Sequence, residues 1–321
     1  MSIVNHLPCW TTPYKEADIA IHTYSTVGDI LAYQRCRRQY GFFSVRKYNS
    51  PAATQRYFGT LMHDVLDQIN RDFQVTGNLP NQQGVYDMVL VAHNRLIRSG
   101  VRTFNAGFQR RRAALLIYRF IQLFGIPFFS NIQQTEYRLN RALVTHTGRD
   151  YILEGIVDVL SGAVSHALRL PYSTEPDDVE IWDYKSGQVP EQGSRELESY
   201  KYQMRVYAEL YRQQTGQYPA RAVLIFLGEL ADDPRWNLAN GDPSMFPRLV
   251  LPVEPHPGRI AVAIQNFNQT VEEIEQERIL PYAQQWQAPS HAVDEQTCRT
   301  CELHYNCDRY PQGRNERSIP L

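Results

Sequence analysis

A short apolar segment, VEIWDYK at residues 179–185, contains an acid and a lysine two positions apart. Side chains alternate along a β-strand, so Asp183 and Lys185 would share one face with Val179 and Ile181. Charged groups at an otherwise apolar strand end are costly unless they are paired or used in chemistry. This pair could hold a cation and stabilise a developing negative charge, and a surface salt bridge is the competing interpretation.

A second carboxylate lies in the apolar segment YILEGIVDVL, which is predicted as a strand over residues 151–160. Its Asp158 shares a strand face with Glu154 and Ile156. Two strands that each end in a carboxylate could hold Mg²⁺, which needs only one or two carboxylates beside water and phosphate oxygens. Taken alone, Asp158 is more typical of a turn or a sheet edge.

Two predicted helices carry polar side chains that could complete this site. Residues 60–74 have an apolar stripe at helical spacing, with His63 at its edge. In the helix predicted over 195–214, Tyr200, Gln203 and Tyr207 share one face. A histidine or an aromatic stripe in such a position is more often part of the core.

The remaining periodicity predicts an α/β fold. Helices are expected over 85–98, 109–124 and 259–280, and strands over 134–144 and 221–227. Turn-rich breaks fall near 76–84, 161–178 and 231–258. This order predicts a mixed sheet flanked by helices, with a helical insertion.

The composition is that of a globular protein. The chain has 321 residues, of which 43% are hydrophobic and 21% charged, and these values argue against disorder. The apolar runs are shorter than eighteen residues, and the N-terminus lacks the pattern of a signal peptide. We therefore expect a cytoplasmic protein with no membrane partner, and an oligomer is compatible with the sequence.

Basic residues are concentrated although the net charge is only −1. Residues 30–63 contain six basic residues and no acid, and residues 95–149 contain ten arginines and one acid. Aromatic residues are interleaved with the first stretch, which is typical of surfaces that bind single-stranded DNA. A solvated helix face and core aromatics are the competing interpretation. The candidate DNA contacts are Arg35, Arg37, Arg38, Tyr40, Arg110, Arg111 and Arg112.

Three cysteines near the C-terminus have the spacing of metal ligands. Cys298, Cys301 and Cys307 form a C-x2-C-x5-C pattern, and Cys36 or Cys9 could supply a fourth thiolate. His304 could instead complete a zinc site with three cysteines. The spacing leaves zinc, an iron–sulfur cluster and cysteines without a metal as alternatives.

Four motifs occur in a characteristic order: FGTLMH (58–63), EGIVD (154–158), DYKSG (183–187) and Y-x2-Q-x3-Y (200–207). This order resembles the RecB-type branch of the PD-(D/E)XK, or restriction-endonuclease-like, nuclease superfamily, over residues 24–310. The resemblance implies Mg²⁺ or Mn²⁺ bound by His63, Asp158 and Asp183. It also implies a catalytic Lys185, with Gln203 and Tyr207 supporting the site. The segment between His63 and Asp158 is unusually long for the family.

The cysteines resemble those of the iron–sulfur branch, which includes the AddB nuclease domain and the CRISPR adaptation nucleases. In that branch one cysteine precedes the nuclease core and three follow it. The resemblance therefore implies a [4Fe–4S] cluster held by Cys36, Cys298, Cys301 and Cys307, which would clasp the two ends of the domain.

The interpretation favoured by the sequence is a metal-dependent DNA nuclease, an exonuclease that prefers single-stranded DNA. Its relatives act in DNA recombination and repair, CRISPR adaptation and phage DNA processing. A DNA-binding accessory subunit of a helicase or integrase, with little nuclease activity, is the alternative. A zinc-binding interaction module is the third hypothesis.

Five segments are expected along the chain. They are an N-terminal basic and aromatic segment with the first cluster cysteine (1–58), a first core helix (59–75), an arginine-rich helical insertion (76–130), the nuclease core (131–230), and a C-terminal helix with the cysteines (231–321).

Overall fold

The structure is a computed structural model. It describes residues 21–48, 54–101, 103–145, 147–170, 174–231 and 246–288, together with 293, 297–298, 301, 303 and 307. The elements in chain order are β1 (His22–Ser25), η1 (Thr26–Leu31), α1 (Ala32–Arg35), α2 (Arg37–Gln39), η2 (Tyr40–Val45), α3 (Thr54–Thr76), α4 (Gln82–Arg98), α5 (Ala106–Phe129), β2 (Ile132–Val144), β3 (Asp150–Ser161), α6 (Val164–Ala167), β4 (Glu180–Lys185), α7 (Arg195–Thr215), β5 (Arg221–Phe226), η3 (Leu227–Leu230), α8 (Phe246–Leu249), β6 (Val250–Val253), α9 (Pro257–Arg278) and η6 (Tyr282–Gln284).

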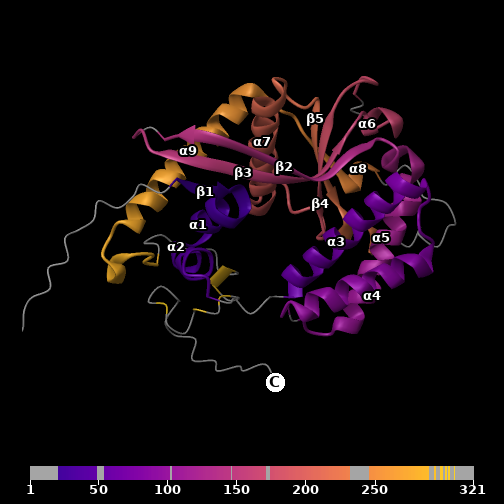
Figure 1. The fold of residues 1–321 in the computed structure, drawn as a ribbon, viewed down its shortest axis with the longest axis horizontal. Helices are drawn as coiled ribbons and strands as arrows, with labels where there is room; N and C mark the ends of the chain where they lie inside the picture. Colours follow the sequence, from indigo (N-terminus) through magenta and orange to yellow (C-terminus); the bar gives the residue numbers. More distant parts are fainter. Residues whose placement is uncertain are drawn as a thin grey trace, which may run out of the picture.

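A six-stranded mixed sheet forms the centre of the fold (Figure 1). The strand order is β1-β3-β4-β5-β6, and β2 pairs with β3. Strands β4 and β5 are parallel and are connected through α7, whereas β2–β3, β3–β4 and β5–β6 are antiparallel. The predicted mixed α/β sheet is therefore confirmed.

Helices cover both faces of the sheet, and β4 shows why. Trp182 and Tyr184 belong to the core that contains the buried faces of α3, α4 and α5. Ile181, from the other face of the strand, belongs to the core that contains α7 and α9. The alternation predicted for residues 179–185 thus places Asp183 and Lys185 on the α7 side.

Strand β3 changes partner along its length, and this opens the sheet. Its beginning pairs with β1 over Tyr151–Glu154, and its end pairs with β4 over Val159–Ser161. Beyond Trp182, strand β4 no longer pairs with β3, so the two strands diverge. A backbone group released from the ladder needs another partner. The amide of Tyr184 finds one in the Asp158 carboxylate, to which it donates at 2.7 Å.

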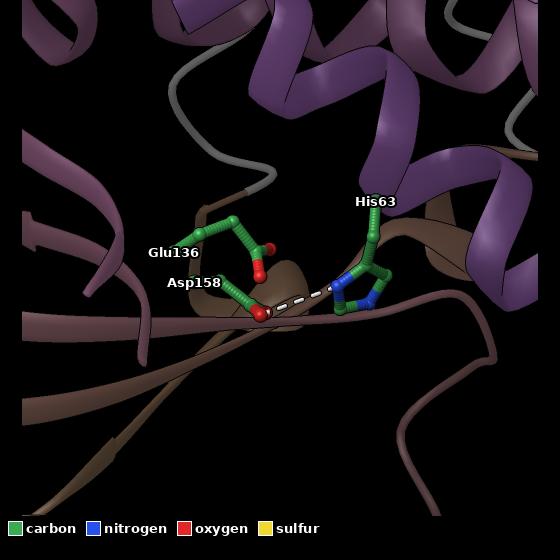
Figure 2. Close-up of side chains that lie close together, drawn as sticks. All are labelled: His63, Glu136 and Asp158. Atoms are coloured by element: carbon green, nitrogen blue, oxygen red, sulfur yellow. Dashed lines mark ion pairs between the residues drawn. The ribbon is translucent and has the colours of Figure 1, made fainter. Parts of the chain in front are cut away.

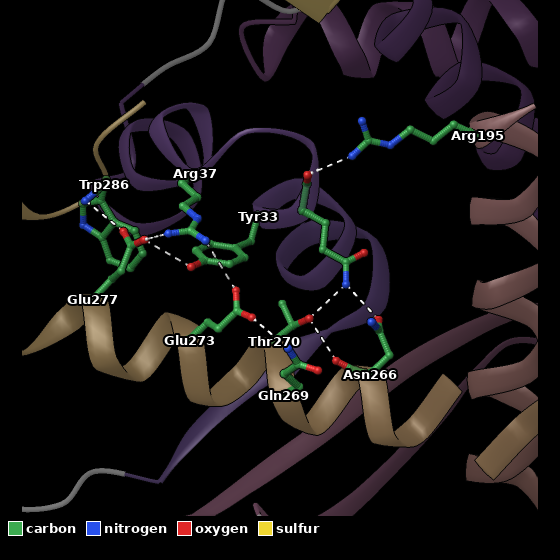
Figure 3. A network of polar contacts seen from close by, with 10 residues as sticks. Tyr33, Arg37, Arg195, Asn266, Gln269, Thr270, Glu273, Glu277 and Trp286 are labelled. Atoms are coloured by element: carbon green, nitrogen blue, oxygen red, sulfur yellow. Dashed lines mark hydrogen bonds and ion pairs between the residues drawn. The ribbon is translucent and has the colours of Figure 1, made fainter. Parts of the chain in front are cut away.

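The N-terminal segment packs against α9, as Figure 3 shows. Arg37 donates to Glu277 at 3.0 Å and lies 3.7 Å from the Glu273 carboxylate. Tyr33 also donates to Glu277, and the Trp286 backbone donates to its other oxygen. The acidic C-terminal helix therefore neutralises part of the basic N-terminal stretch.

Several short elements were not predicted. Strand β1 has only four residues, which is too short for a clear alternating pattern. Strand β6 lies in a turn-rich segment and contains Pro252, which is tolerated because β6 is an edge strand. The predicted end of a helix at Gly125 is a break rather than an end. Gly125 has a φ of 52°, and helix α5 resumes beyond it.

Helix α5 is long and apolar enough to span a membrane by length and composition alone. Half of its most apolar window is buried inside the protein, where its phenylalanines pack against α3 and the sheet. Such a helix is typical of a soluble protein core. Counting uninterrupted apolar runs in the sequence did not identify this segment, because polar residues interrupt it.

We predict that Gly155→Ala destabilises the protein by about 1–3 kcal/mol, the usual cost of overpacking. Gly155 faces α7, and an added Cβ would lie 2.6 Å from the Tyr207 ring. Urea denaturation measures the effect. Gly162→Ala is the matched control, because its Cβ would meet its nearest neighbour, Asn131, at an ordinary 3.6 Å. Equal stability of both variants would contradict the close contact between β3 and α7.

Candidate active site

Asp183 and Lys185 form an ion pair at the end of β4, with 2.6 Å between the Lys185 Nζ and Asp183 Oδ2 atoms. Gln203 on α7 binds both: its Oε1 accepts from Lys185 at 2.9 Å, and its Nε2 donates to Asp183 Oδ1 at 3.1 Å. The same Nε2 donates to the hydroxyl of Tyr207 at 3.0 Å. The Lys185 ammonium also lies 4.5 Å from the centre of the Tyr200 ring. Asp183, Gln203 and Tyr200 therefore fix the position of the Lys185 ammonium, which lines the active-site cleft.

Asp158 faces the same cleft from β3 and contacts His63 of α3. Its Oδ1 lies 3.2 Å from His63 Nδ1, and its Oδ2 accepts the Tyr184 amide described above. The other ring nitrogen of His63 lies 3.0 Å from the Tyr184 carbonyl oxygen. The divergence of β3 and β4 thus aligns an imidazole, two carboxylates and a backbone carbonyl. All six catalytic and metal-binding candidates from the sequence come together here.

Burial and charge act in opposition on these groups. Burial alone would raise the pKa of Asp158, but the charge and hydrogen bond of His63 hold it below its ordinary value. Burial raises the pKa of Asp183; Lys185 partly offsets that rise, and the neighbouring Asp158 adds to it. Burial would lower the pKa of His63, yet Asp158 raises it to about 9. Two buried carboxylates therefore share one imidazolium and one ammonium.

A third carboxylate, Glu136 of β2, points into the site and was not anticipated from the sequence. Figure 2 shows it beside His63 and Asp158, and ligand atoms of these three residues lie within 4.8 Å of one another. Burial and the nearby Asp158 raise the pKa of Glu136. The only signal in the sequence was that Glu136 is the single acid within residues 95–149.

The donor set suits a hard divalent cation. One imidazole nitrogen and several carboxylate oxygens, with space for water, match the preferences of Mg²⁺ and Mn²⁺. Such an ion would be held by His63 and Asp158, with Asp183 or Glu136 adjoining. Bound there, it would activate water and neutralise charge on a phosphate.

A groove extends from this site between α3, α4 and β2. His63 and Asp158 line both the active-site cleft and this groove. Four arginines line it as well, of which Arg71 and Arg95 are partnered by acids of α3. The groove is lined by Arg56, Gly59, Thr60, His63, Asp64, Asp67, Arg71, Arg95, Thr135, Glu136, Arg138, Ile156 and Asp158.

Two of the DNA contacts expected in the N-terminal segment, Arg37 and Tyr40, are engaged within the protein. Tyr40 is 1% exposed, packs against Tyr33 and Trp286, and donates to Asp29, so its expected role as a DNA contact was wrong. Arg37 is engaged by the acids of α9. At Tyr33, Arg37 and Tyr40, the aromatic and basic alternation therefore reflects packing against α9 and Trp286 rather than a base-stacking surface.

The other basic candidates lie at two places. Arg35 is exposed near the active site, where its charge partly offsets the burial that raises the pKa of Tyr200. Arg38 packs over the Phe42 ring at 5.9 Å. On α5, the Arg112 guanidinium lies 5.0 Å from the centre of the Phe58 ring, and Arg111 is exposed. Burial raises the pKa of Tyr57, and the nearby charge of Arg110 offsets part of that rise.

The cysteines do not form a preformed metal site among the described residues. Cys36 is buried, which raises the pKa of its thiol, and the charges of Cys301 and Cys307 raise it further. In the described part of the chain, no three cysteine sulfur atoms come within 4.8 Å of one another. The geometry therefore does not support the expected [4Fe–4S] cluster. Cys9 and His304 lie outside the described residues.

Comparison with known proteins identifies the family of this chain. The family model of the PD-(D/E)XK nuclease superfamily matches residues 25–308. The chain therefore belongs to the PD-(D/E)XK nuclease superfamily. A search of curated proteins finds no match. One similar solved structure, "Crystal structure of SSO0001", is 11% identical with a TM-score of 0.33, and the alignment covers 83% of this chain and 90% of that one.

We predict that His63 stabilises the metal-free protein in a pH-dependent way. Its pKa is raised from 6.5 to about 9 on folding, so its contribution is complete below pH 6.5 and is lost as the pH rises through 9. The difference in unfolding free energy between wild type and His63→Gln should shrink by about 1–3 kcal/mol over that interval. Denaturation in EDTA measures it, and a difference that stays constant or grows with pH would contradict the ion pair with Asp158.

Proposed function

We propose that the protein is a metal-dependent DNA nuclease that hydrolyses phosphodiester bonds. The observation that carries this proposal is the buried Asp183–Lys185 pair, held by Gln203 beside Asp158 and His63. A purely structural salt bridge would not need the Asp158 carboxylate and the His63 imidazole in the same cleft. Membership in a nuclease superfamily supports the same reaction class.

The chain's own residues have separate roles in this proposal. His63, Asp158 and Asp183 bind Mg²⁺ or Mn²⁺, which supplies charge neutralisation and a more acidic water. Lys185 faces the cleft and stabilises negative charge as it develops on the scissile phosphate. Gln203 fixes the positions of Lys185 and Asp183, and Tyr207 supports Gln203. The burial of Asp183 and Lys185 makes their interactions stronger than they would be in bulk water.

We predict that Asp183→Asn and Lys185→Met each lower DNA cleavage by about 100-fold or more. Both substitutions preserve side-chain volume but remove a charge beside the reacting phosphate. Cleavage is measured with Mg²⁺ and with Mn²⁺, on single- and double-stranded DNA labelled at either end. This design also reports strand preference and polarity of digestion.

Matched controls separate chemistry from folding. Lys201→Met removes a lysine of α7 that is paired with Glu198, and Asp150→Asn removes an exposed acid of β3. Each variant's melting temperature is recorded, because Lys185→Met leaves Asp183 buried without its cation. The double variant Asp183→Asn/Lys185→Met removes that unpaired charge and should fold stably without cleaving. Near wild-type cleavage by either single variant would refute the site.

The groove beside the site offers a path for the DNA backbone. Arg56 and Arg138 line it, and neither forms a hydrogen bond or ion pair with the part of the chain that the structure describes. Unpaired guanidinium groups beside a catalytic cleft are typical phosphate contacts. The groove leads directly to Asp158. Single-stranded DNA remains our preferred substrate, with Arg35 and Arg110–Arg112 as further contacts.

We predict that Arg56→Gln and Arg138→Gln each weaken DNA binding and reduce its salt dependence. For a single strand, the slope of log affinity against log salt should fall by about 0.7 for each lost phosphate contact. Fluorescence anisotropy with the cleavage-deficient Asp183→Asn protein measures it. Arg141→Gln, also on β2 but outside the groove, is the control. Equal slopes for Arg138→Gln and Arg141→Gln would exclude this path.

Three finer parts of the proposal rest on the sequence. A [4Fe–4S] cluster at Cys36, Cys298, Cys301 and Cys307 is supported by the cysteine spacing and by the family branch, and zinc is the alternative. Iron and sulfide analysis of anaerobically purified protein tests it. A cytoplasmic location and a role in recombination and repair, CRISPR adaptation or phage DNA processing also remain predictions. A DNA-binding accessory role beside a helicase or integrase would be favoured if the protein bound DNA without cutting it.

A further inference from the structure

The carboxylate of Glu136 lies in the groove that adjoins the catalytic cleft, beside His63 and Asp158. It forms no hydrogen bond or ion pair with any residue that the structure describes. In Figure 2 its carboxylate points toward His63 and Asp158. By contrast, both oxygens of Asp183 are already engaged, one by Lys185 and one by Gln203. The free anionic oxygens of the site therefore lie on the β2 side.

The backbone of β2 is distorted at this residue. Glu136 has a φ of 49°, which is the left-handed region that a residue with a side chain rarely adopts. Strands β2 and β3 keep one register on both sides, with Thr135 opposite Val159 and Tyr137 opposite Val157, but the ladder omits the pair of Glu136 and Asp158. Such a distortion persists only where the surroundings maintain it.

The surroundings hold the distorted segment against α3. The hydroxyl of Thr135 donates to Asp67 at 2.7 Å, which ties β2 to the helix that carries His63. Thr135 and Glu136 consequently both line the groove, although neighbouring residues of a regular strand would face opposite sides. Glu136 and Arg138, two residues apart on β2, face this groove as regular alternation requires, and the carboxylate of Glu136 lies there beside His63 and Asp158.

We infer that Glu136 is a ligand of the divalent cation, supplied by β2 together with His63 of α3 and Asp158 of β3. The three side chains provide one nitrogen and carboxylate oxygens within 4.8 Å of one another. Oxygen ligands of this kind suit Mg²⁺ and Mn²⁺. The inference rests on the proposed metal-dependent function. It adds a ligand that none of the four sequence motifs contains.

Calorimetric titration of the metal-free protein with Mn²⁺, without DNA, tests this inference. Glu136→Gln should weaken Mn²⁺ binding by at least about tenfold, as Asp158→Asn should. Glu154→Gln, which removes an exposed carboxylate from β3, should bind as the wild type does. Thermal melting in EDTA shows whether each variant is folded.

Glu136→Gly distinguishes a ligand from a structural residue. Glycine adopts a positive φ without strain, so this variant should melt at the wild-type temperature or higher in EDTA while binding Mn²⁺ weakly. Wild-type affinity in both Glu136 variants would overturn the inference and leave the nuclease proposal intact. A lowered melting temperature of Glu136→Gly in EDTA would also overturn it, in favour of a structural role. If the wild type itself failed to bind Mn²⁺, the metal-dependent function would fail as well.

Discussion

The site depends on a single backbone hydrogen bond, from the Tyr184 amide to the Asp158 carboxylate. This bond takes the place of the β3–β4 backbone pairing, which ends at Trp182. If the two strands had stayed paired, the Tyr184 amide would donate to a β3 carbonyl and would not be available to the Asp158 carboxylate. Because they diverge, the end of β4 presents Asp183 and Lys185 to a cleft whose other wall is β3. The position of His63 follows, since its ring contacts both Asp158 and the Tyr184 carbonyl.

Electrostatics explains why the surrounding groups are needed. Two buried carboxylates, with Glu136 adjoining, would repel one another without positive charge nearby. In the metal-free protein, an imidazolium at His63 and an ammonium at Lys185 supply it. At Asp158 the effect of His63 outweighs burial and lowers the pKa, whereas at Asp183 burial prevails and raises the pKa. A bound cation would take over the role of the His63 charge and release a proton. The site is therefore stable without metal yet suited to bind one.

Local patterns in the sequence predicted much of this arrangement. Alternation along residues 179–185 correctly placed Asp183 and Lys185 on one face, and helical spacing placed His63 and Gln203 at the edges of apolar stripes. Long-range features could not be read in the same way. Glu136 joins the site through the pairing of β2 with β3, which places it opposite Asp158. Tyr40 looked like a stacking residue because interleaved aromatic and basic residues also arise when a segment packs on an acidic helix such as α9.

The most direct test of this account is a crystal structure of the protein soaked in Mn²⁺, with an anomalous difference map to locate the ion. The account predicts a peak beside Asp158, where β3 and β4 diverge, within coordination distance of an Asp158 oxygen and of His63, while Lys185 keeps its contact with Asp183. A peak remote from Asp158, with the His63–Asp158 ion pair unchanged, would contradict it.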